Sequence, residues 1–212
     1  VSDAVFSRSE SNTSSLATRG GAIGVNAATL TLNNSVDIQN CSAEKFGGAI
    51  YLQGASTMNA DNSLFAKNSV VSGDRAGAVA VYGTSKIYMN QCVFEENVAT
   101  KYGAAVGCET NKAVSCFFNN CVFRGNNGRT NSNSVYYKGG VLGMNNCTAY
   151  NNAASGSDIN FSDGTSGTSG IILNSTILSK ATNCITNYMA ASNAKGVSVL
   201  NSIMLCSGKV ST

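Results

Sequence analysis

The segment Asn62–Asn68, with the sequence NSLFAKN, decides the fold because it returns twice at a constant distance. It recurs as Gln91–Asn97 (QCVFEEN) and as Asn120–Asn126 (NCVFRGN), so these three copies start at positions 62, 91 and 120. Weaker copies start at positions 34, 146, 174 and 201, and the spacing between successive starts is almost uniform. A fixed period of roughly 28 residues is typical of a repeat protein in which each repeat forms one structural unit.

A second motif, whose clearest form is Gly-Gly-Ala followed by an aliphatic residue, recurs in step with the first. Its copies, of which GGAI at 20–23 and 47–50 are the clearest, start at 20, 47, 76, 103 and 139. The segments between the motifs are short and β-rich, and turn residues separate them. We therefore predict an all-β fold, a single-stranded right-handed parallel β-helix of about seven coils. It should occupy residues 1–212 as a single domain.

Equivalent side chains in successive coils should lie about 4.8 Å apart and form stacks. Phe65, Phe94 and Phe123 should form an inward aromatic stack that continues at Tyr150. The predicted aliphatic stack contains Ile23, Ile50, Val79, Val106 and Leu142, and the predicted asparagine ladder contains Asn40, Asn68, Asn97, Asn126 and Asn152. Asparagine amides can bond to one another in such a ladder, and asparagine tolerates the left-handed conformation of tight corners.

Three departures from the period are also informative. The last step of the second motif, from position 103 to position 139, is longer than the others and predicts a loop insertion at 127–138. The stretch 164–170 is rich in Gly, Ser and Thr, which predicts a flexible loop. The first copy has Asp37 where phenylalanine is expected, so the first coil should be irregular.

The composition excludes several classes of protein. Charged residues make up 12% of the chain and hydrophobic residues 43%, so the chain is not disordered by charge and hydropathy. There is no histidine, which is the commonest general base and metal ligand, and no proline to interrupt strand pairing. The net charge of +3 comes without a basic run, so we predict no nucleic-acid partner. No apolar stretch is long enough for a transmembrane helix, and we expect the chain to be part of a longer surface protein with other domains.

The eight cysteines do not have the spacing of a zinc site. Cys92, Cys121 and Cys147 occupy one position of the repeat, which indicates small buried residues in a stack. Serine stands at the same position in the other copies, at Ser63, Ser175 and Ser202. We predict neither a metal site nor a cofactor, and the spacing leaves open whether any cysteines are bridged.

The pairing of an FxxN element with a GGA[ILV] element resembles the repeats of chlamydial polymorphic membrane proteins. The resemblance is carried by FAKN with AGAV, FEEN with GAAV, FRGN with GGVL, and FGGAIY, and it covers roughly residues 18 to 150. The passenger domains of that family are surface adhesins. The resemblance therefore implies a β-helix that is extracellular or displayed at a bacterial cell surface.

Two classes of function remain open at this point. A polysaccharide lyase or hydrolase of the pectate-lyase-like class would need converging carboxylates, whereas the acidic residues are scattered in the repeat register. Glu95 and Glu96 should instead pair across coils with Lys67 and Arg124. No catalytic residue is assigned, and the sequence favours a binding module over an enzyme.

A binding module of this fold uses a coil face or an inserted loop to contact a host protein or a glycan. The insertion at 127–138 is the predicted contact site, because it places two tyrosines beside a cation. Its candidate residues are Arg129, Asn131, Tyr136, Tyr137 and Lys138. Two alternatives are a solvated loop whose tyrosines pack on the coil wall and a purely structural spacer.

Overall fold

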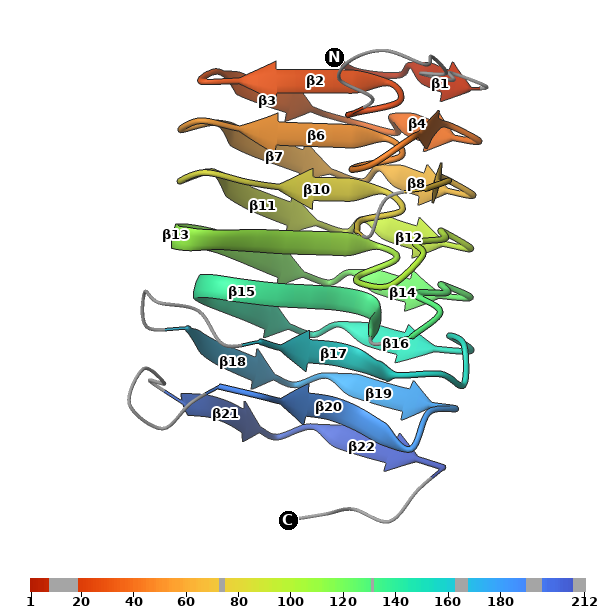
Figure 1. Cartoon of the computed structure of the whole chain (residues 1–212), viewed down its shortest axis with the longest axis vertical. Helices are drawn as coiled ribbons and strands as arrows, with labels where there is room; N and C mark the ends of the chain where they lie inside the picture. Colours follow the sequence, from red (N-terminus) through yellow and green to blue (C-terminus); the bar gives the residue numbers. More distant parts are fainter. Residues whose placement is uncertain (8–18, 73–74, 131, 163–167, 190–195, 208–212) are drawn as a thin grey trace.

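The computed structural model describes residues 1–7, 19–72, 75–130, 132–162, 168–189 and 196–207, without the side chains of 110–113. The chain is a parallel β-solenoid of about six turns, close to the seven predicted, whose strands stack along the long axis (Figure 1). The described residues contain no helix, and hence none that could span a membrane. Three walls, each formed by one strand from every coil, enclose the core.

The long strands β13 (Val106–Asn119) and β15 (Ser132–Asn145) turn the corner between walls 1 and 2 and contribute to both. The other strands of wall 1 are β2 (Ile23–Asn26), β6 (Ile50–Gln53), β10 (Val79–Val81), β17 (Ser157–Phe161) and β20 (Asn183–Asn187). The others of wall 2 are β3 (Thr29–Leu32), β7 (Thr57–Asp61), β11 (Lys86–Asn90), β18 (Ser169–Leu173) and β21 (Gly196–Leu200). Wall 3 contains β1 (Val5–Ser7), β4 (Asp37–Gln39), β8 (Leu64–Ala66), β12 (Val93–Glu95), β14 (Val122–Arg124), β16 (Thr148–Tyr150), β19 (Thr176–Ser179) and β22 (Ile203–Cys206). A short additional pair, β5 (Ser42–Ala43) and β9 (Ser69–Val70), follows the first coils of wall 3.

The predicted aromatic stack is confirmed on wall 3. The rings of Phe65 and Phe94 lie 4.9 Å apart between centroids, and those of Phe94 and Phe123 lie 5.0 Å apart, all nearly parallel and fully buried. The continuation at Tyr150 is wrong, because Ala149 is the register partner of Phe123 and Tyr150 pairs with Arg124 instead. In the first coil Ile38, next to Asp37, pairs with Phe65, so that coil keeps an apolar residue in the stack.

The aliphatic stack on wall 1 is confirmed for its first four members but not for Leu142. Val135 is the register partner of Val106, whereas Leu142 lies on wall 2 opposite Cys116. The repeat therefore steps from Val106 to Val135, which is the ordinary length. The copy of the second motif predicted at Gly139 is in the wrong register. The predicted insertion at 127–138 is accordingly wrong, since most of it is the first half of β15 and only a tight turn precedes that strand.

The asparagine ladder is confirmed for four of its five members. Asn68 donates an amide hydrogen bond to Asn97, Asn97 to Asn126, and Asn126 to Asn152, over 3.0–3.2 Å inside the protein. Asn40 is not a member, because Cys41 occupies the equivalent position and its backbone N–H donates to the Asn68 amide oxygen. The left-handed residues of this corner come one position earlier, at Asn40, Lys67, Glu96, Gly125 and Asn151, so the ladder asparagines serve as hydrogen-bonding groups only.

The last residues of the predicted flexible loop at 164–170 are ordered. Ser169 and Gly170 belong to β18, and the hydroxyl of buried Thr168 accepts a hydrogen bond from the backbone N–H of Gly139 at 3.0 Å. Residues 164–167 lie outside the described part of the chain.

The cysteines of the repeat position are buried, as predicted, and none of the three is bridged. The thiol of Cys92 donates to the backbone carbonyl of Asn90, and those of Cys121 and Cys147 do the same two residues upstream of each. Ser63 makes the equivalent hydrogen bond to Asp61, which explains why serine and cysteine exchange here. Outside this stack, a disulfide joins Cys184 on β20 to Cys206 on β22.

A buried carboxyl group on β17 gives the first testable prediction. Burial raises the pKa of Asp158, and hydrogen bonds from Ser179, Asn152 and Ser134 only partly oppose that effect. The protonated form therefore favours the fold, and stability is lost as the pH rises through the folded-state pKa. D158N keeps the shape without the charge, so we expect it to raise the free energy of unfolding at pH 7 relative to the wild type.

Urea unfolding of D158N and the wild type from pH 3 to pH 8 measures this difference. The two proteins should be nearly equal in stability at the acidic end and diverge as the pH rises. A variant that is less stable than the wild type across the whole range would contradict the assignment.

Candidate functional site

The described residues form a groove of about 690 Å³ on the outward side of wall 2. Side chains alternate along a strand, so the residues between the core positions of β7, β11, β13, β15 and β18 face outward together. Register then brings them into rows across the coils, one residue per strand. Its lining residues are Asn33, Asn59, Ala60, Asp61, Tyr88, Met89, Asn90, Phe117, Phe118, Asn119, Gly143, Met144, Asn145, Ile171 and Leu173.

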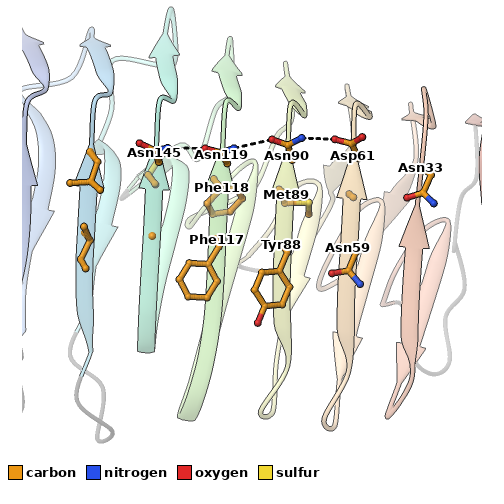
Figure 2. Close-up of a pocket in the computed structure, with 15 residues that line it drawn as sticks. Asn33, Asn59, Asp61, Tyr88, Met89, Asn90, Phe117, Phe118, Asn119 and Asn145 are labelled. Atoms are coloured by element: carbon orange, nitrogen blue, oxygen red, sulfur yellow. Dashed lines mark hydrogen bonds between the residues drawn. The ribbon is translucent and has the colours of Figure 1, made fainter.

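The centre of the groove is an exposed pair of stacked aromatic rings (Figure 2). Tyr88 and Phe117 are register partners, and their rings are nearly parallel with centroids 5.5 Å apart. Tyr88 is 42% exposed and Phe117 37%, although rings of this size are usually covered in a folded protein. The pair therefore offers ring surface to solvent on a rigid sheet.

Gly143 shapes the floor next to this pair. A Cβ atom at Gly143 would lie 2.7 Å from Cδ1 of Phe117, so the absence of a side chain lets the phenyl ring lie close to the backbone of β15. The next residue in the row, Ile171, is 46% exposed and continues the apolar surface beyond the glycine. From Tyr88 onward the row thus contains two rings, a glycine and an aliphatic side chain, and Asn59 precedes Tyr88 in the same row.

A second amide ladder forms the rim of the groove, as the dashed lines in Figure 2 show. Asn90 donates to the carboxylate of Asp61 at 2.6 Å, Asn119 to Asn90 at 3.0 Å, and Asn145 to Asn119 at 2.9 Å. Asn174 extends it by donating to Asn145 at 3.0 Å. The side chains of this ladder are partly or fully exposed, whereas those of the asparagine ladder at the end of wall 3 are buried.

The rim has hydrogen-bonding capacity left for a ligand. Each side-chain amide carries two N–H groups and an oxygen with two lone pairs, and the ladder uses one of each. The oxygen of Asn90 is the exception, because it also accepts a hydrogen bond from the amide of Asn120 at 3.3 Å. Donors and acceptors therefore alternate along the rim, and Asp61 supplies the charge among the lining residues. An apolar floor beside neutral donors and acceptors suits a polyhydroxylated, uncharged ligand.

A separate polar cluster lies on the outward side of wall 1. The guanidinium of Arg75 forms an ion pair with Glu109 and lies 5.0 Å from the ring centroid of Tyr102, and Lys138 lies 3.8 Å from the same carboxylate. Burial alone would lower the pKa of Arg75, but the negative charge of Glu109 holds it above its ordinary value. Burial raises the pKa of Tyr136, whose ring packs against Tyr102. Arg75 and Lys138 share the carboxylate of Glu109, so the cluster ties adjacent coils together.

The structure does not bring the predicted contact residues into one site. Tyr136 and Lys138 belong to the polar cluster on wall 1, whereas Tyr137 is buried and donates its hydroxyl to the carbonyl of Val114 at 2.8 Å. Arg129 is exposed in the turn before β15, and Asn131 lies outside the described residues. Both tyrosines therefore belong to strand β15 rather than to a solvated loop, with Tyr136 in the wall-1 cluster and Tyr137 in the core.

The scattered acidic residues behave as predicted where they meet basic ones. Arg124 bonds to Glu95 at 2.9 Å and Lys67 lies 3.7 Å from Glu96, each pair spanning adjacent coils. In the part of the chain that the structure describes, no three His, Cys, Asp or Glu side chains gather where a metal ion could bind.

Sequence reasoning missed the wall-2 groove, although the signal was present. Tyr88 and Phe117 are separated by one period of the fold, and so are Asp61, Asn90 and Asn119 in succession. An alignment of the strands on that period, with attention to outward positions, would have found both rows. The chain matches no protein-family model, and it shows no significant similarity to a curated protein or to a solved structure.

Proposed function

We propose that this chain is a binding module that holds a neutral glycan in the wall-2 groove. The observation that carries the proposal is the exposed, stacked pair of Tyr88 and Phe117 beside the amide ladder of Asn90, Asn119 and Asn145. Sugar rings present C–H groups on their faces, which pack on aromatic rings, and hydroxyls at their edges, which bond to amides. The groove supplies the two kinds of partner side by side.

A glycan accounts for the groove better than a host protein does. Protein contact sites are usually enriched in arginine and surround a buried apolar centre. Here the rim consists of amides, and Asp61 is the charged residue of the lining. The groove also lies on strands of a rigid sheet, which holds its partners in place before a ligand binds.

The proposal includes a secreted or cell-surface location with an adhesin-like role. The disulfide between Cys184 and Cys206 supports it, because disulfides persist mainly in oxidising compartments outside the cytosol. The repeat motifs that resemble those of chlamydial surface proteins point the same way. No observation on the described residues favours a lyase or hydrolase, and we do not propose one.

The binding proposal predicts that the two rings contribute most of the affinity. On an array of neutral and acidic oligosaccharides, the wild type should retain neutral ones, and calorimetry then gives the affinity for the best. Y88A and F117A should each weaken binding by about tenfold, because each removes a stacking surface worth roughly 1–2 kcal/mol. N119A should weaken it less, by removing one hydrogen-bonding partner.

Tyr188→Ala is the matched control, since Tyr188 is 65% exposed and does not line the groove. It should bind like the wild type. Circular dichroism and thermal unfolding must show that every variant is folded. Retention of no oligosaccharide by the wild type, or unchanged binding by both ring variants, would reject the proposed function.

A further inference from the structure

The corner of β13 between walls 1 and 2 differs from its neighbours. In the preceding coil the inward residues that flank the corner are Val81 and Ile87, six positions apart, and their register partners in β13 are Cys108 and Cys116, eight positions apart. The corner of β13 is also longer than that of the following coil, because its pairing with β15 shifts register between Glu109 and Val114. The longer corner is the one whose two ends carry cysteines.

The two thiols face each other inside the core. Their Sγ atoms lie 2.9 Å apart and both side chains are fully buried, whereas a disulfide bond is about 2.05 Å long. The stacked neighbours of Cys108 are Val81 and Tyr137, and those of Cys116 are Ile87 and Leu142. These neighbours provide an apolar environment in which small movements of the two sulfur atoms would suffice to join them.

From this geometry we propose that Cys108 and Cys116 form a second disulfide, which closes the long corner of β13. Two thiols give up two protons and two electrons in total when the S–S bond forms. A disulfide donor, such as oxidised glutathione in vitro, accepts them and becomes two thiols. The inference does not depend on the proposed glycan function.

The bond should form before the coil closes and then remain inaccessible. Exchange needs a thiolate, and burial raises the pKa of Cys116 well above its ordinary value in the folded protein. The disulfide is therefore structural rather than a switch. It would also fix the strand position from which Phe117, the residue after Cys116, reaches into the wall-2 groove.

Mass spectrometry of the wild type tests the proposal without a variant that could fail to fold. The protein is refolded with oxidised and reduced glutathione, denatured without reductant, alkylated and digested with trypsin. Cleavage after Lys101, Lys112 and Arg124 places Cys108 in peptide 102–112 and Cys116 in peptide 113–124. The two peptides should remain joined until reductant is added, with fragmentation locating the bond at Cys116 rather than at Cys121.

The thiol count gives an independent result. With two disulfides, four of the eight cysteines are alkylated, namely Cys41, Cys92, Cys121 and Cys147. The peptides that contain Cys184 and Cys206 serve as the internal standard for oxidation. Six alkylated cysteines, or a bond that involves Cys121, would overturn the proposal.

Discussion

F94A should lower the free energy of unfolding by about 3–5 kcal/mol, the usual cost of removing a buried phenylalanine ring. Phe94 lies in the middle of the aromatic stack, with nearly parallel rings on both sides and Phe118 packed against it edge to face. Neighbouring coils cannot collapse into the cavity, because backbone hydrogen bonds between β8, β12 and β14 hold them at the strand spacing. The cavity should therefore persist, and with it most of the cost.

Urea unfolding followed by circular dichroism measures this loss, and F117A provides the comparison. Phe117 is the same residue type and is also stacked on one aromatic ring, but it is exposed in the wall-2 groove. Its replacement should cost about 1 kcal/mol or less. Equal losses for the two variants would mean that Phe94 is not a core residue of the solenoid.

The period and the aromatic stack could be predicted because both are required by coil geometry. Phe65, Phe94 and Phe123 recur at the same step because a large side chain on wall 3 must rest on its equivalents in the next coil. The buried asparagines recur for a similar reason, since each amide needs a partner in the adjacent coil. Interior positions therefore carry a sequence signal at every turn of the solenoid.

The register at Leu142 was mistaken because two different corners use similar residues. Gly139 and Gly140 have φ angles of 91° and 89° and serve the corner within β15, whereas the corner equivalent to Gly103 is occupied by Ser132. The hydroxyl of Ser132 accepts a hydrogen bond from the backbone N–H of Gly103 at 2.8 Å. A polar interaction thus replaces the small-residue motif there, and no pattern of glycines could reveal it.

The wall-2 groove was hidden for a different reason. Outward positions need not repeat, and the row of Tyr88 and Phe117 changes to Gly143 and Ile171 within two coils. The step from Asn119 to Asn145 is also shorter than the steps before it, which breaks the period of the exposed ladder. The period therefore reveals the rows as far as Phe117 and Asn119, and the paired strands show that they continue beyond these residues.

N97A should lower the free energy of unfolding by about 3 kcal/mol or more, because alanine would leave several buried polar groups without partners. Each such group costs roughly 1–3 kcal/mol. The amide of Asn97 accepts from the backbone and side-chain nitrogens of Asn68 and donates to the carbonyl of Phe65 and to Asn126. Thermal and urea unfolding both report the loss.

N119A separates the effect of burial from that of the amide hydrogen bonds. At the surface, the side chain of Asn119 donates to Asn90 and accepts from Asn145, as the buried asparagines do with their neighbours. Water can replace the lost partners there, so the variant should lose less than about 1 kcal/mol of stability while its glycan affinity falls. If N97A and N119A were equally unstable, the position of the ladder would not matter and the buried one would not define the corner. If both were as stable as the wild type, coil stacking would rest on apolar contacts alone. The two ladders thus have the same chemistry but differ in burial, and under the proposed function only the exposed one contacts a ligand.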